Sequence, residues 1–281
     1  MGKRFSRPMS VRLDHKFDGR PSQGSKPPSP KTSVVLPPEI LEEILENIPA
    51  DRGNRRTLSA CALVATWWAG PSQRRLFSSV DVYEENFKRW MDGVVLSRSK
   101  DHLLEHVRSL RYTRLVGYRT RHLPQDFGNC LSALRNLHSL TLCFTKVELL
   151  NEDEFRTCFS TFRETLTSLS LDNVTTSFSA FVTLVDYFPN ITTLQLDSFE
   201  LEPSSEPVPS LSRPLRGKLL LRDVDDCRSR SLGQFVKLDL AYEELVINFS
   251  PRYHLEVMER ILRVSTGTVK SLRLTGEIHR E

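Results

Sequence analysis

The sequence predicts an α+β protein, in which a small N-terminal unit of three helices precedes an α/β solenoid with a parallel sheet. Three observations lead to this fold class. Short apolar helical segments bounded by Pro and Gly lie between residues 36 and 82. A six-residue pattern, apolar-x-x-Leu-x-apolar, then recurs seven times, with Arg216 at the first position of one copy. Amphipathic helical segments separate several of these strand-like cores, as expected where crossovers join parallel strands.

Residues 1–33 are predicted to form a disordered, basic tail rich in Pro and Ser. The tail contains eight Lys and Arg residues and two Asp residues, so its net charge is +6 in a chain whose formal charge is +4. The basic character belongs to this tail, and we expect no folded nucleic-acid-binding surface. Nuclear localisation or loose polyanion binding is an alternative for the tail, and MGKRFS fits an acylation pattern at Gly2.

The segment LPPEILEEILENIP, residues 36–49, predicts a short amphipathic helix. Proline suits its first turn, and Pro49 ends it. Glutamates occupy the opposite face. The apolar face is large for so short a helix and consists of Ile40, Leu41, Ile44, Leu45 and Ile48.

A second helix is predicted over residues 57–71, with Thr57 as its N-cap and Gly70-Pro71 as its end. It is apolar nearly all round, so it should be buried on more than one side. Residues 73–82 follow with Leu76 and Phe77 as further anchors. A unit of fewer than about fifty residues buries little surface by itself, so the apolar excess predicts a partner protein.

Residues 34–82 resemble the F-box, in a form common among fungal F-box proteins. The resemblance lies in LPPEIL, in Ile44-Leu45, in the pattern L-x-x-C-x-L-V-x-x-x-W over residues 58–68, and in Arg75-Leu76-Phe77. It departs from the family at Thr66 and Trp67, where a polar or basic residue and a Ser are common.

The resemblance implies that this unit binds the Skp-type adaptor of a cullin–RING (SCF) ubiquitin ligase. Eleven residues would divide between adaptor contact and the internal core, and the sequence leaves the division open: Leu36, Pro37, Pro38, Ile40, Leu41, Ile44, Leu45, Leu58, Cys61, Val64 and Trp68. An ordinary helical hairpin packed on its own chain is the alternative.

Residues 83–106 are predicted to form a linking helix. An apolar stripe at helical spacing supports this and consists of Phe87, Trp90, Met91, Val94 and Val95.

Residues 107–281 are predicted to form about seven strands of a solenoid. The central leucines are Leu110, Leu140, Leu169, Leu194, Leu219, Leu245 and Leu272, at spacings of 30, 29, 25, 25, 26 and 27. This period resembles leucine-rich repeats, which run at about 20–29 residues. The Asn or Cys typical of that family is missing at Thr145, Val174, Phe199, Val224, Ser250 and Glu277, so the repeats are irregular.

Three return segments are predicted helices, at residues 151–162, 177–189 and 250–262, and four prolines make residues 200–214 an extended loop. The chain then ends just after its seventh strand, where an open strand edge would be an association hazard. A terminal cap, a covering partner or a longer natural product would each resolve this.

The polar positions between the leucines should line one face of the sheet and could bind a target protein. They include Arg108, Arg111, His138, Thr141, Thr167, Ser170, Thr192, Gln195, Glu243, Lys270 and Arg273. Our substrate-face candidates are Arg108, Arg111, His138, Gln195 and Arg273. The three arginines could bind a phosphate. A mixture of polar and charged residues is also common on a sheet face that is simply exposed to solvent.

Residues 102–106, HLLEH, fit an inverted zinc-protease pattern. Two histidines on a helix surface are the simpler interpretation, because no distant third ligand is evident. No GxSxG, Walker or dinucleotide-binding motif is present, so we expect no catalytic residue, metal or cofactor.

Five scattered cysteines without a CxxC pair indicate a reducing compartment. No secretory signal or transmembrane segment is evident, and we expect an intracellular protein of the cytoplasm, the nucleus or both. The function expected is that of a substrate-recognition subunit of an SCF-type ligase, whose repeats bind an unknown target protein. A scaffold without a role in ubiquitination, or a repeat protein whose first helices cap the solenoid, is the alternative.

Overall fold

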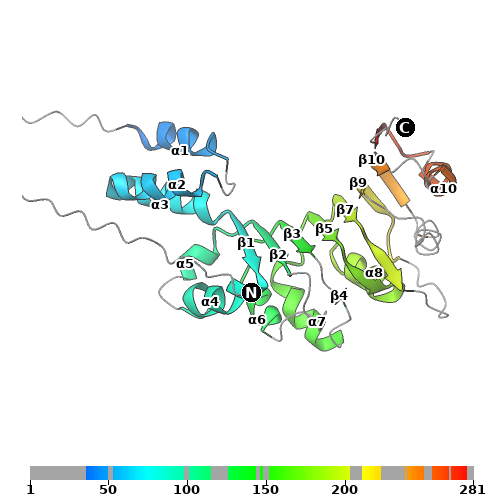
Figure 1. The fold of residues 1–281 in the computed structure, drawn as a ribbon, viewed down its shortest axis with the longest axis horizontal. Helices are drawn as coiled ribbons and strands as arrows, with labels where there is room; N and C mark the ends of the chain where they lie inside the picture. The colour runs from blue at the N-terminus through cyan, green and yellow to red at the C-terminus, as the bar shows by residue number, and fades with distance from the viewer. Residues whose placement is uncertain are drawn as a thin grey trace, which may run out of the picture. The chain divides into compact units, whose positions relative to one another are not determined.

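The computed structural model describes residues 36–49, 53–97, 101–114, 126–143, 146–147, 152–202, 211–222, 238, 240–249, 255–265 and 267–276. The chain divides into two compact units, Met1–Pro37 and Pro38–Glu281. The predicted disordered tail lies outside the described residues. The second unit mixes helices and strands around a parallel sheet, in agreement with the predicted α+β class (Figure 1). None of the helices in the described part of the chain is long and apolar enough to cross a membrane.

Three helices come first, α1 (Pro38–Glu46), α2 (Arg55–Val64) and α3 (Thr66–Phe77). The single helix predicted over residues 57–71 is wrong, because Ala65 is extended at φ −159° and ψ 158° and separates α2 from α3. The two helices pack against each other, which lets an all-round apolar sequence bury part of its surface locally. Pro71 does not end the helix but lies inside α3.

Among the residues that the structure describes, an eight-stranded parallel sheet follows, in the order β1-β2-β3-β5-β7-β9-β10-β11. Its strands are β1 (Ser79–Tyr83), β2 (Ser109–Thr113), β3 (Ser139–Cys143), β5 (Ser168–Asp172), β7 (Thr193–Asp197), β9 (Leu215–Arg222), β10 (Leu240–Phe249) and β11 (Ser271–Gly276).

The seven central leucines pair in register from β2 to β11, as the repeat predicts. Leu110, Leu140, Leu169, Leu219 and Leu245 are completely buried. Only the final one, Leu272, is 44% exposed, because no strand lies beyond β11 among the described residues. Each repeat therefore depends on its neighbours to bury its leucine.

The sequence did not predict β1. Val80 and Val82 pair with Leu110 and Tyr112 of β2, and both valines are buried. Thus the sheet begins inside the segment first assigned to the helical unit.

The helix predicted over residues 83–106 is interrupted. It consists of α4 (Glu84–Trp90), a π-helix η1 (Met91–Val95) and α5 (Asp101–Leu104). The predicted apolar stripe still packs on the sheet, with Phe87 and Met91 buried.

The remaining return segments contain α6 (Phe127–Ser132), α7 (Glu152–Phe159), the 3-10 helix η3 (Ser160–Phe162), α8 (Phe178–Tyr187) and α10 (Leu255–Ser265). Helix α8 has a side-chain cap, since Ser177 Oγ accepts a hydrogen bond of 3.1 Å from the Ala180 amide. A second parallel sheet joins β4 (Lys146–Val147), β6 (Thr175–Ser177) and β8 (Glu200–Glu202). Residues 203–210, part of the predicted loop, lie outside the described residues.

One continuous apolar core extends from Val80 to Ile261 between the large sheet and its return segments. Figure 1 shows α4, α6, α7 and α8 on the same side of this sheet. The opposite side, which we call the outer face, presents the residues that alternate with the buried leucines.

A leucine-to-alanine change should cost far more inside the ladder than at its end. Leu169→Ala removes a fully buried side chain and should lower the free energy of unfolding by about 2–5 kcal/mol. Leu272→Ala, in the same register row but half-exposed, should cost under about 1.5 kcal/mol. Urea denaturation followed by circular dichroism measures both, and equal losses would contradict the ladder.

Gly217 should not tolerate a side chain. Its φ is +88°, and an added Cβ would lie 2.2 Å from the Thr192 carbonyl oxygen, so Gly217→Ala should destabilise by more than about 1 kcal/mol. Gly93→Ala is the control, because Gly93 lies in the helical segment η1, where an added Cβ would have no atom of a more distant residue within 4 Å. That change should stabilise by about 0.5–1 kcal/mol. The melting temperature should therefore fall for Gly217→Ala and rise for the control variant. An unchanged melting temperature for Gly217→Ala would contradict this prediction.

Candidate functional site

The three N-terminal helices have a hydrophobic core of their own. Leu41 and Leu45 of α1 and Leu58 of α2 are at most 2% exposed and form this three-leucine core. It is a separate cluster from the core of the sheet. Partly buried side chains pack around it: Ile48, Cys61, Trp68 and Leu76. The helices therefore fold around internal contacts and do not rely on the sheet alone.

Other apolar side chains of these helices point away from this core. Ile40 and Ile44 are 43% and 41% exposed, and Val64 is 67% exposed. Leu63, at 87%, and Trp67, at 38%, add to the exposed set, although the sequence did not place them among the binding candidates. Large apolar side chains held in water on adjacent elements are typical of a protein-binding surface.

The structure thus divides the predicted adaptor-binding residues. Leu41, Leu45 and Leu58 belong to the core, with Cys61 and Trp68 at its margin. Ile40, Ile44 and Val64 are available on the surface, as is the exposed Pro38. Leu36 and Pro37 belong to the first unit of the chain.

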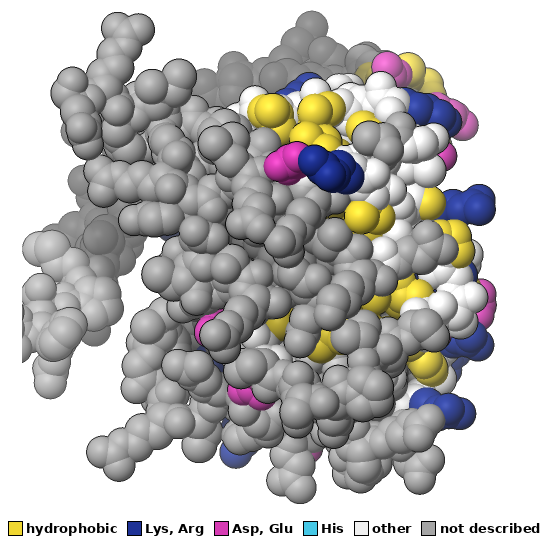
Figure 2. All heavy atoms as spheres, turned by 90° about the vertical axis from the view of Figure 1, so that its right-hand side faces the viewer, with side chains coloured by type: hydrophobic (Ala, Val, Ile, Leu, Met, Phe, Trp, Pro, Cys, Tyr) yellow, Lys and Arg dark blue, Asp and Glu magenta, His cyan; other side chains and the backbone are white. Residues whose placement is uncertain are grey.

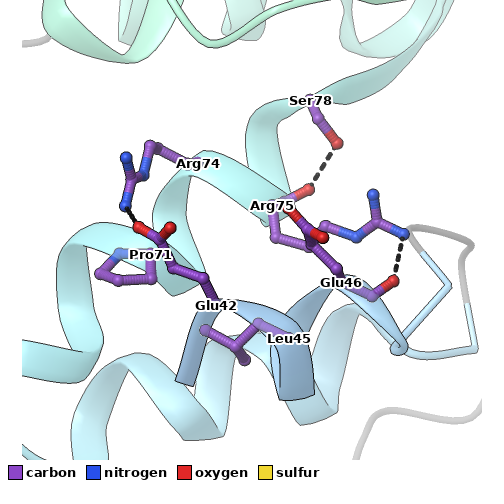
Figure 3. Close-up of a pocket in the computed structure, with 7 residues that line it drawn as sticks. All are labelled: Glu42, Leu45, Glu46, Pro71, Arg74, Arg75 and Ser78. Carbon is purple, nitrogen blue, oxygen red and sulfur yellow. Dashed lines mark hydrogen bonds and ion pairs between the residues drawn. The ribbon is translucent and has the colours of Figure 1, made fainter. Parts of the chain in front are cut away.

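A pocket of about 240 Å³ separates α1 from α3 (Figure 3). Its lining residues are Glu42, Leu45, Glu46, Pro71, Arg74, Arg75 and Ser78. Helical geometry puts Glu42 and Glu46 on the flank of α1 opposite to Ile40 and Ile44.

The polar groups of this pocket mostly bind one another. Arg74 forms an ion pair with Glu42. Arg75 donates from Nε to the Ile48 carbonyl oxygen at 3.0 Å and from Nη2 to that of Glu46 at 3.1 Å. These bonds satisfy carbonyl groups at the end of α1. Arg75 therefore holds α1 against α3.

The helical unit joins the sheet without an intervening linker. The Ser78 carbonyl oxygen, directly after α3, accepts hydrogen bonds of 2.9 Å from the amides of Arg108 and Ser109. Arg55, at the start of α2, donates to the Ser79 carbonyl oxygen at 3.2 Å and pairs with Asp81 of β1 at 3.3 Å. These contacts fix the orientation of the helices relative to the first strands.

The outer face presents aligned rows of side chains. The central row contains Asp81, Arg111, Thr141, Ser170, Gln195, Leu220, Val246 and Arg273, one from each successive strand. A neighbouring row presents hydroxyl groups on five strands, at Ser79, Ser109, Ser139, Ser168 and Thr193.

The substrate-face candidates lie in two different places. Arg111, Gln195 and Arg273 are in the central row. Arg108 and His138 precede their strands, where the His138 amide donates to the Arg108 carbonyl oxygen at 2.8 Å, and both side chains are exposed.

Arg111 already has partners on the outer face. Its Nε lies 3.4 Å from Cys143 Sγ, and its Nη2 lies 3.4 Å from Asp172 Oδ2. The hydrogen bond to Cys143 raises the pKa of Arg111, and burial raises the pKa of the Cys143 thiol. Five strands lie between Arg111 on β2 and Arg273 on β11, so the structure does not bring the predicted arginines together.

The HLLEH segment does not form one helix. Helix α5 ends at Leu104, so Glu105 and His106 lie in the following turn. His102 is exposed, and burial lowers the pKa of the half-buried His106. The two histidines therefore do not share the helix face that the zinc-protease pattern requires.

Comparison of the sequence with models of known protein families gives no match, and comparison with curated proteins gives none either. A functional interpretation therefore depends on the residues and on their geometry.

Replacing Arg75 should loosen α1. Arg75→Gln removes two charge-assisted hydrogen bonds to the end of this helix, which should lower its local opening free energy by about 1–2 kcal/mol. Hydrogen exchange of the α1 amides measures the change. Arg56→Gln is the matched control, because Arg56 is exposed on α2, and equal exchange in both variants would contradict the assignment.

Proposed function

We propose that this chain is an F-box protein that serves as a substrate-recognition subunit of an SCF-type cullin–RING ubiquitin ligase. Its three helices bind a Skp-type adaptor, and its leucine-rich-repeat-like sheet binds a target protein. The chain itself is not catalytic and needs no cofactor. We place it in the cytoplasm, the nucleus or both.

The observation that carries this proposal is the surplus of apolar surface on a helical unit that already has a core. Leu41, Leu45 and Leu58 satisfy the internal packing. Ile40 and Ile44, on the same helix as two of these leucines, remain more than two-fifths exposed. Covering such side chains contributes about 1–2 kcal/mol each, which favours a protein partner on this side of α1.

The mechanism proposed is positioning. The adaptor holds the ligase machinery on α1–α3, while the outer face holds the target. The hydrogen bonds that the Ser78 carbonyl oxygen accepts and those that Arg55 donates to β1 fix the angle between these two surfaces. Ubiquitin transfer is then accelerated because other subunits act on a target held in proximity.

One observation favours a second candidate, a repeat-based binding protein whose helices only cap the sheet. Helix α3 leads into β1 through a single residue, Ser78, as a capping element would. The separate three-leucine core argues against it, because a cap would be expected to share the core of the repeats.

Co-purification with a Skp-type adaptor tests the proposal. Residues 30–281 should bind, and Ile40→Asp/Ile44→Asp should weaken binding by more than about 2 kcal/mol, because two apolar contacts become charges. Lys88→Asp/Arg89→Asp is the matched control, since both residues are exposed on α4, and it should bind normally. Circular dichroism checks that the repeats stay folded. A soluble, folded chain that fails to bind would favour the capping alternative.

A further inference from the structure

The two edges of the large sheet differ in how well they are covered. At the β1 edge the inward residues Val80 and Val82 are buried, and α3 packs against the strand. Arg55 of α2 donates to the Ser79 carbonyl oxygen and pairs with Asp81 of the same strand. The helical unit therefore caps the β1 edge.

The β11 edge is uncovered in the part of the chain that the structure describes. Strand β11 pairs with β10 on one side, and no described strand lies on the other. Its inward residues Leu272 and Leu274 pair with the buried Leu245 and Ile247 but are themselves 44% and 46% exposed. Val264 of α10, in the return segment before β11, is 44% exposed. Figure 2 views this end of the molecule and shows hydrophobic side chains on its described surface.

The occupant of this edge must satisfy two layers of the fold. Backbone amide and carbonyl groups on the outer side of an edge strand are available for pairing with another strand. Leu272 and Leu274 require apolar side chains beside them on the inner face, and Val264 requires apolar cover from the helical layer. A strand that carries its own return helix supplies all of these, as repeats do for one another. A lone extended peptide would leave Val264 uncovered.

The charges around this edge do not favour a charged occupant. Strand β11 carries a single charged residue, Arg273. Of the nearby cations, Lys270 pairs with Glu243 at 2.7 Å, and Arg263 pairs with Glu259 on α10. An apolar, nearly neutral edge is best covered by an edge of the same kind, and the β11 end of a second copy has this composition.

We propose that β11 pairs with β11 of a second copy of this chain, so that the two large sheets join into one. This inference goes beyond the proposed function and does not depend on it. Because the β1 edge is capped, a head-to-tail filament from β11 to β1 cannot form. The pairing is instead two-fold symmetric, which closes the association at a dimer. A two-fold axis perpendicular to the sheet makes the paired strands antiparallel and keeps both inner faces on the same side.

Charge selects the register of this pairing. A two-fold axis at Arg273 would put the two arginines directly opposite each other, which is destabilising. An axis at Leu272 would put Lys270 opposite the partner's Leu274. An axis at Leu274 pairs this leucine with its own copy and puts Arg273 opposite the partner's Thr275, so no like charges meet. The dimer is therefore centred on Leu274.

Light scattering coupled to size-exclusion chromatography of the full chain tests the proposal. At micromolar concentration the mass should be twice the 32.3 kDa of one chain. Leu274→Lys puts two like charges at the centre of the pairing and should weaken the dimer by at least about tenfold. Leu96→Lys is the matched control, because Leu96 is 64% exposed after η1, and it should leave the dimer intact. Circular dichroism checks that both variants are folded.

Two substitutions at one position separate dimerisation from folding. Thr275→Glu would face the partner's Arg273 and should tighten the dimer by about two- to tenfold, counting both symmetric pairs. Thr275→Arg should weaken it by a similar factor. Sedimentation velocity over a range of concentrations measures both dissociation constants. A general loss of folding cannot produce opposite changes at the same site.

Cross-linking tests the register directly. In the proposed pairing the two copies of residue 274 lie about 5–6 Å apart, whereas the two copies of residue 272 are offset by four residues, about 14 Å along the strand. A short bismaleimide should therefore link Leu274→Cys chains efficiently and Leu272→Cys chains poorly. The unaltered chain gives the background from its native cysteines.

Four results would overturn the proposal: the mass of a single chain at every concentration, a dimer that survives Leu274→Lys, an equal loss in Leu96→Lys, or equal cross-linking at residues 272 and 274. A dimer that survives Leu274→Lys would assign self-association to another surface. Adaptor co-purification of Leu274→Lys should match that of the unaltered chain, so failure of the dimer and failure of the proposed function are distinguishable.

Discussion

The parallel stacking of leucines is the constraint on which the rest of this structure depends. A single strand with one inward leucine cannot bury it, whereas Leu140 is fully buried because Leu110 and Leu169 lie beside it in register. The same register that buries one set of side chains aligns the alternate set on the outer face. The alignment of the outer-face rows therefore follows from the packing of the core. The polarity of the outer face depends on the outward-facing residues, whose type the packing of the core does not restrict.

The helical unit is stabilised in a different way. Its three-leucine core is small, and its remaining apolar residues are more than the unit can bury. It is stabilised by the fastening of α1 to α3 through Arg75 and by the attachment of α2 and α3 to the first strands. Two surfaces of different chemistry are thereby held in a fixed relation, an apolar one on the helices and a polar one on the sheet.

The repeat was predictable because its signal is periodic and because burial requires the same residue type in each unit. The central leucines identify seven strands correctly. Strand β1 escaped notice because its inward residues are Val80 and Val82, although Val80 precedes Leu110 by 30 residues, the spacing that separates Leu110 from Leu140. The 30-residue spacing therefore indicates β1, whereas a search for leucine at the inward position misses it.

Features that depend on tertiary contacts were not predictable. The break at Ala65 arises where α2 folds back onto α3, and no Gly or Pro marks it in the sequence. Periodicity placed Ile40 and Leu41 on one face, and only packing shows that Leu41 is buried and Ile40 is not. The partners of Arg111 come from strands 32 and 61 residues away, so its engagement could not be inferred from local sequence.

Hydrogen–deuterium exchange of the full chain, with and without a Skp-type adaptor, tests the central claim most directly. The account predicts that the adaptor slows exchange in α1 around Ile40 and Ile44 and in the segment from Leu63 to Trp67. The strands of the large sheet should exchange as they do in the free chain. Protection of the outer-face strands without protection of these helical segments would contradict the account.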